Sequence, residues 1–219
     1  MPWIAGCRLL HRDPWVLIVD KPCGLLSQPG LGPAQADSLL SRLQNHEPTL
    51  ALVHRLDRDT SGLLMLARTS DALSAFSRLF ASRRVRKLYV ADVCGAPPGS
   101  SGCVDLPLAR LQTHPPRYGW HPDGRSSQTR WRVQSGRRLW LQPITGRSHQ
   151  LRAHLAALGC AIQGDPIYAG HDQAESGRMH LHATALSLRH PFTGQRLRCR
   201  SAVPFLPPAL LSARPDQAG

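Results

Sequence analysis

The chain has 219 residues, of which 42% are hydrophobic, so it can bury a core as one large domain or two small ones. Lysine and arginine number 27 against 14 acidic residues, which gives a formal net charge of +13. This excess favours a polyanionic partner, nucleic acid first, because phosphate neutralisation releases counterions. No apolar run approaches 18 residues and residues 1–10 lack the charged start of a signal peptide, so we expect a cytoplasmic protein with no membrane contact.

The sequence lacks the motifs of several common enzyme classes and metal sites. The six cysteines form neither a CxxC pair nor a Cys/His set at zinc-finger spacing, so we expect them reduced and buried, with no metal site. The chain has no GxSxG elbow, no Walker-type phosphate loop and no GxGxxG after a strand. A glycosidase would need two carboxylates facing one bond, and acidic residues are few here.

Apolar periodicity and turn residues predict the elements in chain order. They are a strand over 15–19, a helix over 38–44, a strand over 63–67, a helix over 71–82 capped by Ser70, and a strand over 88–95. Then come exposed loops over 96–102 and 111–124, a hairpin of strands 128–133 and 138–144, a helix over 145–159, and strands over 179–188 and 195–199.

The predicted loop over 111–124 mixes aromatic and cationic side chains, among them Arg117, Tyr118 and Trp120. Such interleaving suits contacts with bases and phosphates of a nucleic acid. A loosely packed surface loop explains the same residues equally well, so both interpretations stay open.

The segment over 53–67, VHRLDRDTSGLLMLA, places Asp57 between two arginines, just before an apolar strand. A carboxylate between cations is expected to stay ionised, and at the end of a strand it can reach a ligand. Alternatively, Asp57 and Asp59 only form a turn and the arginines a solvated rim.

Two further segments carry charges next to turns. Lys21 follows the strand over 15–19, where it is either a phosphate ligand or a plain surface lysine. The helix over 145–159 carries Arg147, His149, Arg152 and His154, which cannot all belong to its core face. In one interpretation all four side chains face solvent. In the other, the helix N-terminus and Arg147 together bind an anion.

The string HRLDRDTSGLLMLA resembles, almost position by position, the catalytic motif of the RluA family of RNA pseudouridine synthases. DKPCGLL, RKLYVA, TGRSHQLRAHL and MHLHATAL are similar to other elements of that family and occur in the family's order. The resemblance extends from about residue 16 to residue 205 and so covers nearly the whole chain.

The resemblance implies an α+β fold, in which a long mixed, mostly antiparallel sheet is flanked by helices and loops. We expect one catalytic domain over 1–219, with its core over about 14–206 and no S4 RNA-binding domain, and a monomer. The implied reaction cleaves the N1 to C1′ bond of a uridine in RNA, turns the base and rejoins it through C5. It uses no cofactor and no metal.

The resemblance also implies roles for five residues. Asp57 is the catalytic aspartate, acting as nucleophile at the ribose or as base at C2′. Arg147 pairs with that aspartate, and Tyr89 stacks on the target uracil. Arg55 fills the space that the base vacates, and Leu181 lines the pocket.

The RNA target is suggested by two strings. PITGRSHQLR and ALGCAIQGDPIYA look closest to S4-free members that modify both 23S ribosomal RNA and transfer RNA, whereas HRLDRDTSG is nearer the general family form. The competing hypothesis is a basic RNA-binding protein without catalysis. A metal-dependent nuclease is weaker still.

Overall fold

The computed structural model describes residues 3–170 and 177–205. Its first half contains β1 (Trp3–Ile4), β2 (Cys7–Arg12), β3 (Val16–Lys21), a short 3-10 helix (Pro33–Gln35), α1 (Leu39–Gln44), β4 (Ala51–Leu52), β5 (Ser61–Ala67), α2 (Ser70–Ala81) and β6 (Arg86–Asp92). Its second half contains β7 (Ser101–Asp105), β8 (Leu108–Gln112), β9 (Arg117–Trp120), β10 (Gln128–Ser135), β11 (Arg138–Pro143), α3 (Gln150–Ala157), β12 (Leu181–Arg189) and β13 (Arg196–Arg200). In this part of the chain, no helix has the length and apolar character needed to cross a membrane.

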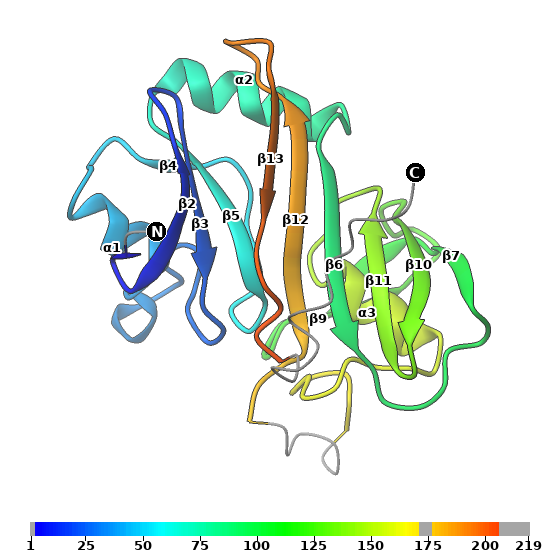
Figure 1. Cartoon of the computed structure of the whole chain (residues 1–219). Coiled ribbons are helices and arrows are strands. Elements are labelled where there is room, and N and C mark those ends of the chain that lie inside the picture. Colours follow the sequence, from blue (N-terminus) through cyan, green and yellow to red (C-terminus); the bar gives the residue numbers. More distant parts are fainter. Residues whose placement is uncertain (1–2, 171–176, 206–219) are drawn as a thin grey trace.

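One sheet organises the described chain (Figure 1). Its strand order is β1-β2-β3-β5-β12-β6-β11-β10-β7, with β13 added to β12 and β4 to β5. β5 and β12 pair in parallel, whereas the other pairings of this sheet are antiparallel. The expected α+β fold with a mixed, mostly antiparallel sheet is therefore confirmed.

The parallel pairing of β5 with β12 joins the two halves of the sheet. All seven residues of β5 are buried, as expected of a central strand covered on both faces. Gly62 has φ +112°, and a Cβ added there would lie 2.4 Å from the carbonyl oxygen of Ala183 on β12. Only glycine permits this close approach of the two strands.

The helices α1 and α2 follow their predictions closely. α1 begins after Ser38, whose hydroxyl accepts a hydrogen bond from the Ser41 amide in a capping box. α2 begins one residue earlier than predicted, because Thr69 rather than Ser70 supplies the capping oxygen. Figure 1 shows α2 across one end of the sheet, where it buries Phe76 and Leu79.

Two predictions need correction. Much of 111–124, expected to be a loop, belongs to the hairpin of β8 and β9, which forms its own two-stranded sheet. The helix expected over 145–159 begins only at Gln150, because the Thr145 hydroxyl donates to the Gln150 side chain instead of capping at 145. α3 packs against β9, β10 and β11, so it is covered on more than one side.

Candidate active site

The loop that carries Asp57 connects β4 to β5 and is fixed by the segment that follows β3. The Ser27 hydroxyl donates to the Leu56 carbonyl at 2.7 Å and accepts from the Leu56 amide at 3.1 Å. The Gly24 amide donates to the Arg58 carbonyl at 3.0 Å. The backbone on both sides of Asp57 is thus held by hydrogen bonds, which directs its side chain.

Lys21 fixes the same loop from inside the protein. It is fully buried, and its Nζ donates to the carbonyl oxygens of Pro22, Leu25 and Arg58 at 2.9, 2.6 and 2.9 Å. Burial lowers the pKa of this ammonium group to about 8. Neither sequence interpretation of Lys21 was right, since it is neither at the surface nor open to phosphate.

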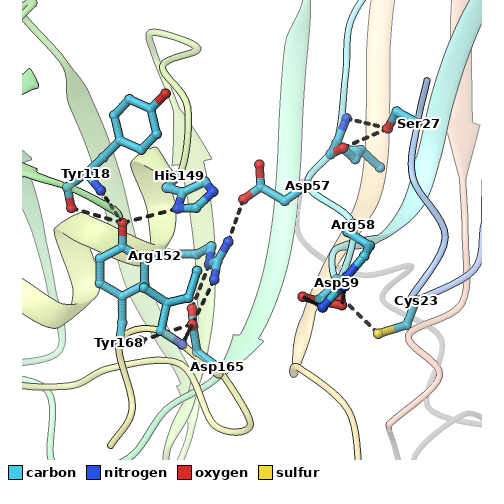
Figure 2. A network of polar contacts seen from close by, with 12 residues as sticks. Cys23, Ser27, Asp57, Arg58, Asp59, Tyr118, His149, Arg152, Asp165 and Tyr168 are labelled. Atoms are coloured by element: carbon cyan, nitrogen blue, oxygen red, sulfur yellow. Dashed lines mark hydrogen bonds and ion pairs between the residues drawn. The ribbon is translucent and has the colours of Figure 1, made fainter. Parts of the chain in front are cut away.

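Asp57 forms an ion pair with Arg152 of α3 (Figure 2). Arg152 Nη1 donates to Asp57 Oδ2 at 3.2 Å, and the Asp57 side chain is 28% exposed. Among the described residues, no hydrogen bond reaches the other carboxylate oxygen, Oδ1. One oxygen is therefore fixed and the other is open to a ligand.

Arg152 is itself held by Asp165, and both side chains are almost completely buried, with exposures of 3% and 0%. Arg152 Nε and Nη2 donate to the two carboxylate oxygens of Asp165 at 2.7 and 2.8 Å. The amides of Ile167 and Tyr168 donate to Asp165 Oδ1 at 2.9 and 3.2 Å. This bidentate geometry fixes the guanidinium plane and leaves Nη1 directed at Asp57.

The charge of Arg152 is secured by its two acidic neighbours. Burial alone would lower the pKa of the guanidinium, but the hydrogen bonds and charge of Asp165, together with Asp57, outweigh burial and raise that pKa. The Tyr168 ring also lies 5.2 Å from the Arg152 guanidinium, in cation–π contact. The group opposite Asp57 is thus a permanent cation.

Arg147 does not pair with Asp57, contrary to expectation. It lies before α3, in the exposed turn, and its Nε donates to the Ser126 carbonyl at 3.2 Å. The pairing arginine is Arg152, one and a half turns further along, because α3 presents that side chain toward the loop before β5.

Tyr89 lies on β6, and the charge of Asp57 affects the pKa of its hydroxyl. It is buried, with 9% exposure, and burial followed by the negative charge of Asp57 raises the pKa of its hydroxyl. Across the strands, Tyr89 is opposite Ala183 of β12. The charge of Asp57 thus acts on the hydroxyl of this predicted site residue.

Leu181, the first residue of β12, is buried at 3% exposure and lies opposite Ala91 of β6. Directly paired residues share a face of a sheet, as do residues two apart, so Leu181 and Tyr89 point to the same face. Arg55 is exposed on the loop before Asp57, and among the described residues no hydrogen bond joins it to the carboxylate. Arg58 pairs with Asp59 instead of Asp57.

A second network borders Asp57 on the side of α3 (Figure 2). The Tyr168 hydroxyl donates to the Tyr118 carbonyl and accepts from the Tyr118 amide, both at 2.9 Å, which ties the segment after α3 to β9. His149 Nδ1 lies 3.2 Å from the same hydroxyl. The polar contacts of the site thus extend from Asp57 to the β8–β9 hairpin.

Sequence reasoning gave no role to Asp165 or Tyr168, and its interpretation of Arg152 and His154 as solvent-facing was wrong, because both are buried. The signal was present in GDPIYA, where one of few acidic residues precedes an aromatic residue, but its partner is 13 positions away on a helix. In the described part of the chain, no three His, Cys, Asp or Glu side chains gather in a way that could hold a metal ion.

Comparisons with known proteins identify the family of this chain. The sequence model of the family described as RNA pseudouridylate synthase matches residues 15–157. The dual-specificity RNA pseudouridine synthase RluA of Yersinia pestis is 40% identical over 90% of this chain and 99% of its own length. RluA of Escherichia coli K12 is 38% identical over 93% of this chain and 95% of its own length. The chain therefore belongs to the RluA family of RNA pseudouridine synthases.

Solved structures show the same fold. Human RNA pseudouridylate synthase domain containing 1 superimposes with a TM-score of 0.79 at 26% identity, covering 94% of this chain and 88% of its own. Human RNA pseudouridylate synthase domain containing 4 gives a TM-score of 0.70 at 27% identity, covering 90% and 88%.

Proposed function

We propose that this protein is an isomerase that converts uridine to pseudouridine in structured RNA, with Asp57 as the catalytic residue. The observation that carries the proposal is the half-open carboxylate: one Asp57 oxygen is bound by the buried Arg152–Asp165 pair, and the other receives no hydrogen bond from a described residue. A protein that only binds RNA has no use for a carboxylate aimed in this way.

The reaction rearranges one nucleotide without net gain or loss of atoms. The N1 to C1′ bond breaks, the uracil turns, C5 bonds to C1′, and the C5 proton leaves while N1 gains one. Asp57 acts either by bonding to C1′ and leaving again or by removing and returning a proton at C2′. Both roles use the carboxylate as an electron-pair donor, and Arg152 orients that carboxylate through the 3.2 Å ion pair.

The surrounding residues act on the base and the sugar. Tyr89 stacks on the uracil, and an aromatic stack of roughly 1 to 3 kcal/mol per base offsets the cost of turning the base out of the RNA. Leu181 supplies an apolar wall on the same face of the sheet. Arg55 fills the space vacated by the base, and Arg147, which is exposed, binds the RNA.

The substrates we propose are 23S ribosomal RNA and transfer RNA. Their chemistry suits the net charge of +13. The relatives named as dual-specificity synthases match almost their whole length. Because these RNAs occur in the cytoplasm, we place the protein there.

Tritium release tests the proposal. RNA labelled at uridine C5 is incubated with purified protein in the presence of a metal chelator. We expect wild type to release tritium from both RNA classes, Asp57→Asn to release none, and Asp71→Asn, a charge-matched change on exposed α2, to release it at the wild-type rate. Binding without release would instead favour a non-catalytic RNA-binding protein, and loss of release with chelator a metal-dependent enzyme.

A further inference from the structure

His149 occupies a backbone conformation that a side chain adopts only at a cost. It immediately precedes α3 with φ 52° and ψ 18°, in the left-handed region, and its side chain makes no capping hydrogen bond. For a residue other than glycine this conformation is strained and needs support from its surroundings. In this conformation the imidazole ring contacts the rings of Tyr118 and Tyr168.

Figure 2 shows the His149 ring between the side chains of Tyr118 and Asp57. Its centroid lies 5.2 Å from that of the Tyr118 ring and 5.9 Å from that of the Tyr168 ring. The imidazole is half-buried, and Asp57 has the largest effect of the surrounding charges on its pKa, ahead of Arg152. The ring is therefore fixed on two sides and faces the carboxylate on the third.

The hydrogen bonds of Tyr168 determine the tautomer of His149. A phenol has a single proton, and that of Tyr168 lies in the 2.9 Å bond to the Tyr118 carbonyl. At 3.2 Å, His149 Nδ1 must therefore be the donor to the phenol oxygen. Burial lowers the pKa of the imidazole, although Asp57 opposes this, so the ring is neutral and Nε2 carries a free lone pair.

Nε2 has no hydrogen-bond partner among the described residues and is not sealed from solvent. An acceptor is thus available on the side of the ring that faces Asp57 (Figure 2), whose Oδ1 receives no hydrogen bond from a described residue. In a uridine whose C1′ or C2′ meets Asp57, the nearest hydrogen-bond donor is the 2′-hydroxyl. The uracil N3–H lies beyond C2, two ring bonds from the glycosidic nitrogen.

We propose that His149 Nε2 accepts a hydrogen bond from the 2′-hydroxyl of the target uridine and so makes the site specific for ribose. The contact orients the sugar toward Asp57. It also keeps the hydroxyl from donating to the carboxylate, whose free oxygen must reach either C1′ or the proton on C2′. This inference rests on the proposed function, since it assumes that a uridine binds at Asp57.

A double comparison tests the contact. Once the modified position is mapped, short RNAs carrying either uridine or 2′-deoxyuridine there are turned over by wild type and by His149→Phe under single-turnover conditions. The ratio of the two rates in each protein contains the intrinsic effect of the sugar on bond cleavage, and comparing the ratios of the two proteins cancels that effect. We expect the ratio to fall about tenfold in His149→Phe, the size of one lost hydrogen bond.

The controls separate the possible outcomes. His46 is an exposed histidine after α1, and the variant His46→Phe should keep the wild-type ratio of the two rates. An unchanged ratio in His149→Phe would overturn the inference while leaving the proposed function intact. Wild type that turned over no uridine would overturn both.

A binding measurement covers the case in which His149→Phe does not fold. Asp57→Asn protein is titrated with RNA carrying uridine, 2′-deoxyuridine or 2′-fluorouridine at the target position. We expect about tenfold weaker binding of both analogues, because neither offers a donor. Equal affinity for all three RNAs would overturn the contact.

Discussion

Arg152 reaches Asp57 with one nitrogen, Nη1, while its other two nitrogens are occupied by Asp165. The guanidinium thus joins a fully buried carboxylate to one that is 28% exposed. Asp165 neutralises and orients the cation, so Asp57 needs to satisfy only one donor. A carboxylate with a free oxygen next to a fixed cation suits nucleophilic or basic chemistry.

The first prediction concerns Asp165. Asp165→Asn leaves Arg152 as a buried cation without its bidentate partner, so we expect the free energy of unfolding to fall by about 3 kcal/mol. Urea denaturation at neutral pH measures this loss. Asp37→Asn is the matched control, because the Asp37–Arg42 pair is exposed on both sides and should leave the midpoint unchanged. Equal midpoints for all three proteins would contradict the role assigned to Asp165.

The second prediction separates the two arginines near α3. Lysine keeps the charge but cannot contact Asp57 and Asp165 together, so Arg152→Lys should lower the single-turnover rate about 100-fold. Arg147→Lys keeps the charge at an exposed position and should leave that rate within about twofold of wild type. If Arg147→Lys proved the slower variant, our assignment of Arg152 as the partner of Asp57 would be wrong.

The third prediction is a pH dependence caused by Lys21. Its pKa is about 8 in the folded protein, against an ordinary value of 10.5, because the ammonium group is buried. Between these values the unfolded chain binds more protons than the folded protein, so this lysine makes stability rise with pH. Over that window its contribution amounts to ~3 kcal/mol.

The contribution is measured as a difference between two proteins. Buried Cys7 and Cys199, whose thiol pKa values are raised to about 12 and about 11, act in the opposite direction over part of this range. Urea unfolding from pH 7 to 10.5 is therefore compared for wild type and Lys21→Met, which share the cysteines. We expect wild type to gain stability relative to the variant as pH rises. Parallel curves would mean that Lys21 is not perturbed in the folded state.

The fourth prediction concerns Gly62, where β5 and β12 approach each other. Gly62→Ala combines a left-handed φ with a clash against the Ala183 carbonyl, so we expect a loss of about 3 kcal/mol of stability. Gly136→Ala is the control: its φ is +52°, but an added Cβ meets nothing within 4 Å. This second change should cost about 1 kcal/mol, and thermal melting of both proteins checks the difference.

Local patterns predicted most of the elements that build the sheet. The hairpin about Gly136 follows from alternating residues around a turn, and α2 follows from its capping residue and apolar spacing. α3 is different, because it is buried on several sides and its polar side chains bond inward. His154, buried, contacts the hydroxyls of Ser127 and Thr129, an arrangement that helical periodicity cannot indicate.

The sequence indicates candidate site residues where they lie within one motif. It does not indicate the contacts that form between segments far apart in the chain. Asp57 and Tyr89 were proposed from their motifs, and in the structure the charge of Asp57 raises the pKa of the Tyr89 hydroxyl. The choice between Arg147 and Arg152 depends on where α3 begins, which is set by the Thr145–Gln150 hydrogen bond. Asp165 required knowledge of a contact across 13 residues, which sequence spacing alone does not provide.

The last prediction concerns the β8–β9 hairpin, which exposes Trp120 at 60% and Leu111 at 54%. An exposed tryptophan near arginines suits stacking on an unpaired base, so Trp120→Ala should weaken RNA binding about tenfold at every salt concentration. Arg110→Ala should instead lower the dependence of log affinity on log salt by about one phosphate contact.

Filter binding of the RNA substrate from 50 to 300 mM salt distinguishes the two effects. The aromatic control is Phe192→Ala, because Phe192 is 41% exposed but stacks on Trp15 at 5.1 Å, away from the hairpin. This change should lower stability and leave RNA affinity unchanged. If Trp120→Ala and Phe192→Ala bound RNA as wild type does, the hairpin would be a packing element of α3 rather than part of the RNA surface.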